Sequence, residues 1–261
     1  MTMINDDSRR FTGIQRLYGK QAYQKFNSSH ICIIGIGGVG SWVAESLARS
    51  GIGKLTLIDL DHIAESNINR QIHALSSTLG QSKISAMQER ILQINPECDV
   101  IMIDDHLTID NIPSLIDRRY SYIIDCIDQF RIKAALIHFC RSNKLHLLTI
   151  GGAGGRIDPS QIKIADLTRS EGDALLAKTR KQLRTHHSFP RNIKRRFDIP
   201  CIFSTEQLRY PTDDDEISTN KSNCTNLSGL NCANGFGSLS AVTATFGMQA
   251  AAYTLNKIAN S

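Results

Sequence analysis

The chain has 261 residues, of which 41% are hydrophobic and 21% charged, and this composition excludes a wholly disordered protein. Seven cysteines, an odd number with no Cys-x-x-Cys pair, argue against a disulfide framework and a four-cysteine zinc site. The first residues lack the apolar core of a secretory signal, so we expect a cytoplasmic protein with a core of its own.

The net charge of +5 is concentrated in one segment of the chain. From Lys178 to Arg196 there are eight Lys and Arg residues and no acidic residue, so the rest of the chain is net acidic. A local patch of this kind indicates a surface that binds a polyanion. A solvated, mobile basic loop explains the same residues equally well at this stage.

Apolar runs alternate with amphipathic stretches through the first 155 residues. We predict strands at His30–Ile34, Leu55–Ile58, Val100–Ile103, Tyr122–Ile124 and Leu145–Ile150, with a further candidate at Cys201–Ser204. We predict helices over Gly13–Phe26, after Gly40, over 84–94 and over Arg131–Cys140. Alternation of this kind predicts an α/β protein with a Rossmann-like, doubly wound, mostly parallel sheet and a C-terminal extension.

The segment Leu239–Leu255 is long and uncharged. It is rich in Ala, Thr, Ser and Gly, which gain little on transfer into lipid. A small-residue helix packed against the core or a partner is therefore favoured over a membrane span.

A glycine pattern follows the first predicted strand. Gly35, Gly37 and Gly40 satisfy G-x-G-x-x-G before a helix, and Asp59 ends the next strand. Glycines let the backbone approach phosphates, the helix N-terminus offers free N–H groups, and the acid binds ribose hydroxyls. The pattern suits a nicotinamide-dependent oxidoreductase as well, and a tight turn without any ligand also satisfies it.

The residues that follow favour a different chemistry. A cation- and amide-rich set lies near the predicted strand ends, namely Asp61, Asn69, Arg70, Gln71, Lys83 and Asp128. Hydride transfer does not need these groups, whereas cleavage of ATP between its α- and β-phosphates does. Arg and Lys neutralise phosphate charge, and an aspartate can hold Mg²⁺.

The runs GIGGVGS, LIDLD, NINRQ and DCID together resemble the ubiquitin-activating-enzyme-like superfamily with its ThiF-type adenylyltransferases. The resemblance implies that ATP activates a carboxylate as an acyl-adenylate. It assigns Gly37, Gly38 and Gly40 to the phosphates, Asp59 to ribose, and Asp128 to Mg²⁺. Asn69, Arg70 and Lys83 become the phosphate-binding and catalytic set.

Further runs narrow the resemblance to one branch, the tRNA threonylcarbamoyladenosine dehydratases. They are RFTGIQRLYG, NRQIHAL, QINPEC, TIGGAGGRIDPSQI, FSTE and NCANGFGSLSAVTATFG. This branch implies ATP-dependent closure of a threonylcarbamoyl side chain, next to the tRNA anticodon, into a ring. It also implies one domain over 1–261, with a nucleotide-binding core (28–155) and an extension (156–261) that faces the substrate and tRNA.

Two departures from the wider superfamily bear on its partners. Gly13 occupies the position of an arginine that relatives supply to the neighbouring subunit, and Arg16, one turn later, is the candidate replacement. The zinc cysteine pairs of the sulfur-carrier enzymes are absent, which argues against the alternative of a ubiquitin-like substrate. Resemblance further implies a homodimer and a possible cysteine-desulfurase partner.

Two more features remain open. Cys232 lies just before the last helix, where a thiolate would be favoured and could take the acyl group as a thioester, although direct cyclisation needs no thiol. The Gly-rich run 151–155 either admits substrate close to the backbone or forms a tight turn.

Overall fold

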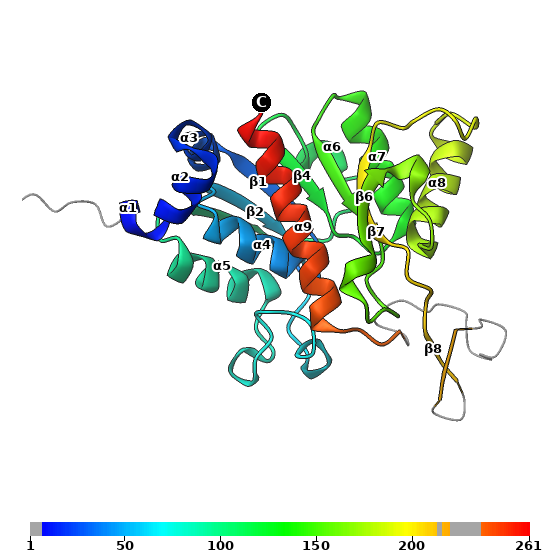
Figure 1. Ribbon diagram of the computed structural model, residues 1–261, viewed down its shortest axis with the longest axis horizontal. Coiled ribbons are helices and arrows are strands. Elements are labelled where there is room, and N and C mark those ends of the chain that lie inside the picture. Colours follow the sequence, from blue (N-terminus) through cyan, green and yellow to red (C-terminus); the bar gives the residue numbers. More distant parts are fainter. Residues whose placement is uncertain (1–6, 213–215, 220–235) are drawn as a thin grey trace, which may run out of the picture.

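A seven-stranded sheet forms the centre of the molecule in the computed structural model, which describes residues 7–212, 216–219 and 236–261 (Figure 1). The strand order is β3-β2-β1-β4-β5-β7-β6, and every neighbouring pair is parallel except β7 and β6. The strands are β1 (His30–Ile34), β2 (Lys54–Ile58), β3 (Asp99–Ile103), β4 (Tyr122–Asp125), β5 (Leu147–Ile150), β6 (Ile162–Asp166) and β7 (Pro200–Ser204).

The central strands form because their side chains are buried on both faces. In β1 and β4 every residue is buried, as expected for continuous β-branched runs in a parallel sheet with helices on both sides. The sheet reverses its order between β1 and β4, which creates a switch point at their carboxyl ends. Ligands of open α/β sheets bind at such a point.

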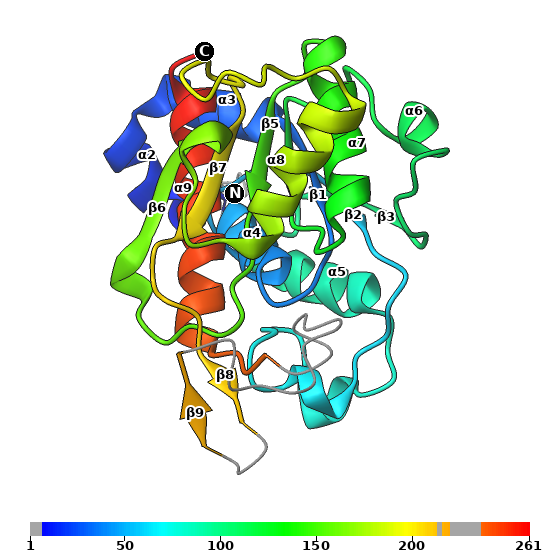
Figure 2. The ribbon, with the colours of Figure 1, turned by 90° about the vertical axis from the view of Figure 1, so that its right-hand side faces the viewer.

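Helices cover both faces of the sheet (Figure 2). One face packs α3, α4, α5 and α9 into one apolar cluster, and the other packs α6, α7 and α8 into a second. The helices are α1 (Asp7–Arg10), α2 (Thr12–Tyr18), α3 (Lys20–Ser28), α4 (Gly40–Arg49), α5 (Lys83–Ile94), α6 (Ile112–Leu115), α7 (Phe130–Ser142), α8 (Ala174–His186) and α9 (Ser240–Ala259).

The sequence predicted this Rossmann-like architecture correctly, and the predicted strands differ from the observed ones by at most two residues at an end. The predicted helix over Gly13–Phe26 is two helices, because Gly19 adopts a φ of 85° and breaks the run between α2 and α3. The extension contains β6 and α8, neither of which was predicted.

Residues beyond Gly155 continue the same sheet. β7 pairs with β5, and β6 returns antiparallel along β7. A short hairpin, β8 (Tyr210–Pro211) with β9 (Ile217–Ser218), protrudes from the body of the molecule (Figures 1 and 2). α9 then crosses the sheet and packs on α4 so closely that a Cβ at Gly247 would lie 2.6 Å from Cβ of Trp42. Within the described ranges, no helix is long and apolar enough to cross a membrane.

Candidate active site

A pocket of about 680 Å³ opens at the carboxyl ends of the central strands. It lies at the switch point between β1 and β4, where the sheet order predicts a ligand. Ten of the eleven residues predicted to bind ATP or the metal line it: Gly35, Gly37, Gly38, Gly40, Asp59, Asp61, Arg70, Gln71, Lys83 and Asp128. Residues far apart in the sequence therefore meet at one site.

The loop between β1 and α4 requires two of its glycines for steric reasons. Gly35 adopts a φ of 87°, which side chains other than glycine rarely tolerate. A Cβ at Gly40 would lie only 1.9 Å from the carbonyl oxygen of Gly35, so the turn closes only with glycine there. At Gly37 no atom lies within 4 Å of such a Cβ, so space remains above the loop for a phosphate.

Asp59 holds the glycine loop and the start of the next loop together. Its Oδ2 accepts a hydrogen bond from the backbone N–H of Ile36 at 2.6 Å, and its Oδ1 accepts one from Asp61 at 2.8 Å. Burial raises the pKa of Asp59, while Lys83 and the two N–H groups oppose that rise. A carboxylate oxygen can accept a second hydrogen bond, so a ribose hydroxyl can still bind here.

Lys83 begins α5 and points into the pocket as an ion pair with Asp61. Its Nζ lies 2.6 Å from Oδ2 of Asp61, and the lysine side chain is 8% exposed while that of Asp61 is 56% exposed. Burial would raise the pKa of Asp61, but the hydrogen bond and charge of Lys83 outweigh it and lower the pKa. The pocket therefore holds a buried cation beside an accessible carboxylate.

Arg70 is anchored to two helices through its backbone carbonyl, whereas its guanidinium makes only exposed hydrogen bonds. Its carbonyl oxygen accepts hydrogen bonds from Nε1 of Trp42 on α4, at 3.0 Å, and from Oγ1 of Thr243 on α9, at 3.4 Å. Its guanidinium donates to the carbonyl of Ser66 and to Oδ1 of Asn69. These partners are exposed, so a phosphate can replace them.

Asn69 and Gln71 lie on either side of Arg70 and have different environments. Asn69 does not line the pocket, because its amide nitrogen donates to the backbone carbonyl and the hydroxyl of Ser238. Gln71 lines the pocket and is buried, and its Oε1 has no hydrogen-bond partner in the part of the chain that the structure describes. Asn69 thus contacts Arg70 rather than the pocket itself.

The two acids of the DCID run have opposite environments. Asp125 is fully buried and paired with Lys133 at 2.8 Å. Asp128 is exposed, lines the pocket, and has no hydrogen-bond or ion-pair partner among the described residues. Only Asp128 is therefore available to a ligand or a metal ion.

Several lining residues were not among the site residues predicted from the sequence. Residues 105–108 follow β3, Leu175 belongs to α8, and Thr243 belongs to α9. The position of 105–108, directly after a parallel strand, is a signal that could have identified that loop. Leu175 and Thr243 carry no such signal, because the turns that bring α8 and α9 to the pocket depend on the extension.

The Gly-rich run 151–155 forms another wall, and its first polar groups are occupied within the protein. The N–H of Gly152 donates to Oδ2 of Asp173 at 2.9 Å, and the Gly152 carbonyl accepts from Arg156. A Cβ at Gly151 would lie 2.1 Å from Oδ2 of Asp173. The run forms a tight turn, as one of the two sequence interpretations predicted, and residues 151–153 line the pocket.

Comparison with known proteins identifies the family. The ThiF family model matches residues 9–261. The chain belongs to the ThiF family. It is 48% identical to tRNA threonylcarbamoyladenosine dehydratase of Escherichia coli over 260 residues, covering 99% of this chain and 97% of the relative. The relative of that name in Haemophilus influenzae is also 48% identical, over 99% of this chain and 96% of the relative.

A solved structure shares the fold and holds a nucleotide. The E. coli tRNA N6-threonylcarbamoyladenosine dehydratase in complex with ATP matches with a TM-score of 0.85 and 45% identity, covering 99% of this chain and 97% of that chain. The glycine loop and cations of this ThiF-family chain therefore lie on the scaffold of an ATP-binding relative.

Two cysteines lie within the sequence runs that carry the resemblance, Cys126 in DCID and Cys232 in NCANGFG. Cys232, the predicted nucleophile, lies outside the described residues. Cys126 lines the pocket behind the glycine loop, where a Cβ at Gly40 would lie 3.5 Å from its Cβ. Burial raises the pKa of the Cys126 thiol, which disfavours the thiolate.

The basic stretch is not one mobile loop, because its first part forms α8. Arg180 and Arg184 are half-buried there; Arg180 donates to Oγ of Ser170, and Arg184 lies over the ring of Phe197. The remaining basic side chains are exposed: Lys178, Lys181, Arg191, Lys194, Arg195 and Arg196. A polyanion can therefore contact six of the eight charges.

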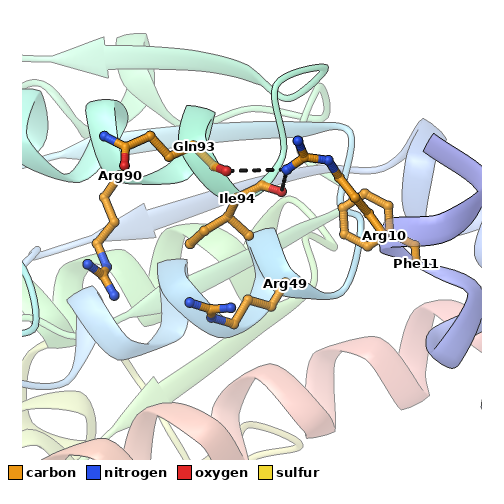
Figure 3. A pocket seen from close by; sticks show the side chains of 6 residues that line it. All are labelled: Arg10, Phe11, Arg49, Arg90, Gln93 and Ile94. Atoms are coloured by element: carbon orange, nitrogen blue, oxygen red, sulfur yellow. Dashed lines mark hydrogen bonds between the residues drawn. The ribbon is translucent and has the colours of Figure 1, made fainter. Parts of the chain in front are cut away.

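A second pocket of about 440 Å³ lies at the other end of α4 and α5 (Figure 3). Its arginines are already engaged within the protein. Arg10 donates to the carbonyls of Gln93 and Ile94 at the end of α5, while Arg49 and Arg90 both pair with the buried Glu45. These contacts join α1, α4 and α5, so the three arginines have a structural role.

Proposed function

We propose that this protein uses ATP to dehydrate the N6-threonylcarbamoyladenosine next to the anticodon of tRNA, closing the side chain into a ring. The observation that carries the proposal is one pocket that combines the glycine loop, Lys83, Arg70 and Asp128, whose carboxylate has no partner among the described residues. The 48% identity to a dehydratase over nearly the whole chain supports the choice of substrate.

The chemistry begins with the side-chain carboxylate, which is a poor electrophile. Its oxygen attacks the α-phosphorus of ATP, the bond to pyrophosphate breaks, and an acyl-adenylate forms. The thiolate of Cys232 would then displace AMP to form a thioester. The neighbouring carbamoyl group attacks the acyl carbon and expels the thiolate, a step that gains from proximity within one molecule. Lys83 and Arg70 would stabilise the charge on the attacked phosphate and on departing pyrophosphate.

In this proposal, different residues of the pocket bind different parts of ATP. Gly35, Gly37, Gly38 and Gly40 admit the phosphates, Asp59 binds the ribose, and Asp61 and Gln71 complete the lining. Asn69 acts through Arg70, with which it is hydrogen-bonded at 2.9 Å. The 28–155 core would hold ATP, and the 156–261 extension would face tRNA within one domain.

The pocket fits Mg²⁺ bound together with ATP. Among the described residues, no three His, Cys, Asp or Glu side chains gather into a metal site. One carboxylate without a partner among the described residues, that of Asp128, is enough for Mg²⁺ when phosphate oxygens and water supply its other ligands. When bound, the ion would neutralise phosphate charge.

The exposed basic side chains of α8 and of residues 191–196 provide the proposed tRNA surface. Phosphate contacts supply affinity that does not depend on sequence, and Leu175 at the start of α8 lines the pocket.

We also propose a cytoplasmic homodimer in which Arg16, exposed on α2, serves the neighbouring site. By resemblance, a cysteine-desulfurase system is the proposed sulfur-related partner.

Cys232 is the proposed acceptor of the acyl group after adenylation. Formation of the acyl-adenylate requires no thiol. A Cys232→Ala variant is therefore expected to keep ATP–pyrophosphate exchange and lose ring closure. Full ring closure by this variant would assign the second step to direct attack by the carbamoyl group.

The proposal is tested with purified protein, ATP, Mg²⁺ and tRNA that carries the threonylcarbamoyl group. Mass spectrometry of the digested tRNA should show ATP-dependent loss of one water from that nucleoside, and Asp128→Ala should abolish it. If tRNA is unchanged while the protein exchanges pyrophosphate into ATP with a carrier protein ending in Gly-Gly, the function is sulfur-carrier adenylylation instead.

A further inference from the structure

A buried carboxylate lies directly beneath the loop that carries Asp128. Asp125 ends β4 and is fully buried, as are Lys133 on α7 and Thr149 on β5. Oδ2 of Asp125 accepts hydrogen bonds from Nζ of Lys133, at 2.8 Å, and from Oγ1 of Thr149, at 2.7 Å. None of the three side chains can reach ATP directly, because none lines the pocket.

The other oxygen of Asp125 is hydrogen-bonded to the backbone of the loop that carries Asp128. Oδ1 accepts a hydrogen bond from the backbone N–H of Ile127 at 3.0 Å. The backbone of Cys126 is fixed as well, since its N–H donates to the carbonyl of Ile34 at 2.9 Å. Asp128 is the next residue and has no partner of its own among the described residues, so these bonds set where its carboxylate lies.

We propose that Asp125 is a positioning residue for the metal-binding carboxylate of Asp128, with Lys133 and Thr149 fixing its orientation. The proposal rests on the proposed role of Asp128 in binding Mg²⁺ with ATP. Side chains that orient a metal ligand commonly change metal affinity when they are replaced. An ion pair alone would stabilise the fold, and the loop N–H gives Asp125 its second task.

A matched pair of double variants separates the effect of the buried ion pair from the effect of the hydrogen bond to the Ile127 N–H. D125N/K133M and D125L/K133M both remove the buried ion pair without leaving an unpaired charge, and the two residues at 125 are similar in size. Asparagine keeps an oxygen acceptor for the Ile127 N–H, whereas leucine does not. The variants therefore differ mainly in the bond that holds the loop.

The measurement is the affinity for α,β-methylene ATP by calorimetry, with Mg²⁺ and with EDTA. The dissociation constant in EDTA divided by the one in Mg²⁺ reports the coupling between metal and nucleotide. A loss of folded protein affects both constants and cancels in this ratio. D125L/K133M should reduce the ratio about tenfold, and D125N/K133M should stay near wild type. Equal ratios in the two variants would overturn the positioning role.

Asp128→Ala is the reference for the metal site itself. It should reduce the ratio at least as much as D125L/K133M does. If Asp128→Ala leaves the ratio unchanged, the proposed metal site fails, and the positioning role fails with it. If Asp128→Ala lowers the ratio but D125L/K133M does not, the metal site stands and only the role of Asp125 is overturned.

Discussion

Nζ of Lys83 lies 2.6 Å from Oδ2 of Asp61, and both residues line the pocket. The backbone reinforces this pair, because the N–H of Lys83 also donates to the carbonyl of Asp61 at 3.0 Å. The cation proposed to contact ATP phosphates is thus held in place before ATP binds. Since a phosphate would compete with Asp61 for Lys83, the pair influences both affinity and rate.

Lys83→Met should lower the rate of pyrophosphate release by on the order of a hundredfold, the cost of losing one charge-stabilising donor.

Asp61→Asn should bind ATP more tightly, since a negative charge leaves the pocket, yet turn over more slowly, since Lys83 loses its fixed position. Calorimetry gives the ATP affinity, and pyrophosphate release gives the rate. A wild-type rate in Asp61→Asn would contradict a positioning effect.

Two glycine replacements should have different consequences. Gly40→Ala places a Cβ within 1.9 Å of the Gly35 carbonyl oxygen, so the loop must distort and the thermal midpoint should fall. Gly37→Ala meets no atom within 4 Å and should leave the midpoint unchanged, but its methyl occupies space proposed for phosphate. Thermal unfolding with and without ATP distinguishes the two. A drop in the midpoint of Gly37→Ala would disagree with an open loop.

Replacing Arg195 and Arg196 with Gln should weaken tRNA binding and flatten its salt dependence. Each phosphate contact contributes about 0.9 to the slope of log affinity against log salt for a duplex, so the slope should decrease by about 2. Filter binding at several salt concentrations measures this change. The matched control is Lys20→Gln with Arg118→Gln, two exposed charges outside the basic stretch. An equal decrease in the control would attribute the effect to net charge.

Two buried histidines predict how stability depends on pH. Burial, followed by the charge of Lys54, lowers the pKa of His30 to about 4, and burial, followed by Lys83 and Arg90, lowers that of His73 to about 4. In the unfolded chain these histidines have pKa values near 6.5. Between pH 4 and 6.5 the unfolded chain therefore binds more protons than the folded protein does. The free energy of unfolding should be highest above pH 6.5 and fall as the pH is lowered toward 4.

His73→Leu isolates one of these contributions. Neither ring nitrogen of His73 has a hydrogen-bond partner among the described residues, so the change removes a titrating group and no hydrogen bond of its side chain. The pH dependence of the unfolding free energy should become shallower by at most about 1.4 kcal/mol per pH unit. Urea unfolding at pH 7.5, 6 and 5 provides the comparison. Identical slopes in the variant and the wild type would argue against a titrating His73.

The sequence predicted the parts of the site that follow directly from strand ends. Asp59 and the glycine loop each come straight after a buried apolar run, and chain order alone brings them together. Side-chain direction was not predictable in the same way. Asn69 turns to Ser238, 169 residues later, and so leaves the pocket.

The missed elements have physical reasons as well. The charges of α8 obscured its narrow buried face, which is formed by Leu176, Thr179 and Leu183. Asp125 gave no sign of its buried pairing, because Lys133 follows eight residues later on another element and Thr149 lies on a third. Contacts of this kind depend on packing between elements, which a pattern along one element does not encode.

The anchoring of Arg70 by Thr243 has a consequence for synthesis of the chain. The glycine loop, Arg70 and Lys83 leave the ribosome early, while α9 leaves near the end. Until α9 packs on α4, Arg70 lacks one of its two helix anchors and the pocket lacks a wall. A nascent chain that has already formed its central strands would therefore not yet hold ATP as the finished protein does.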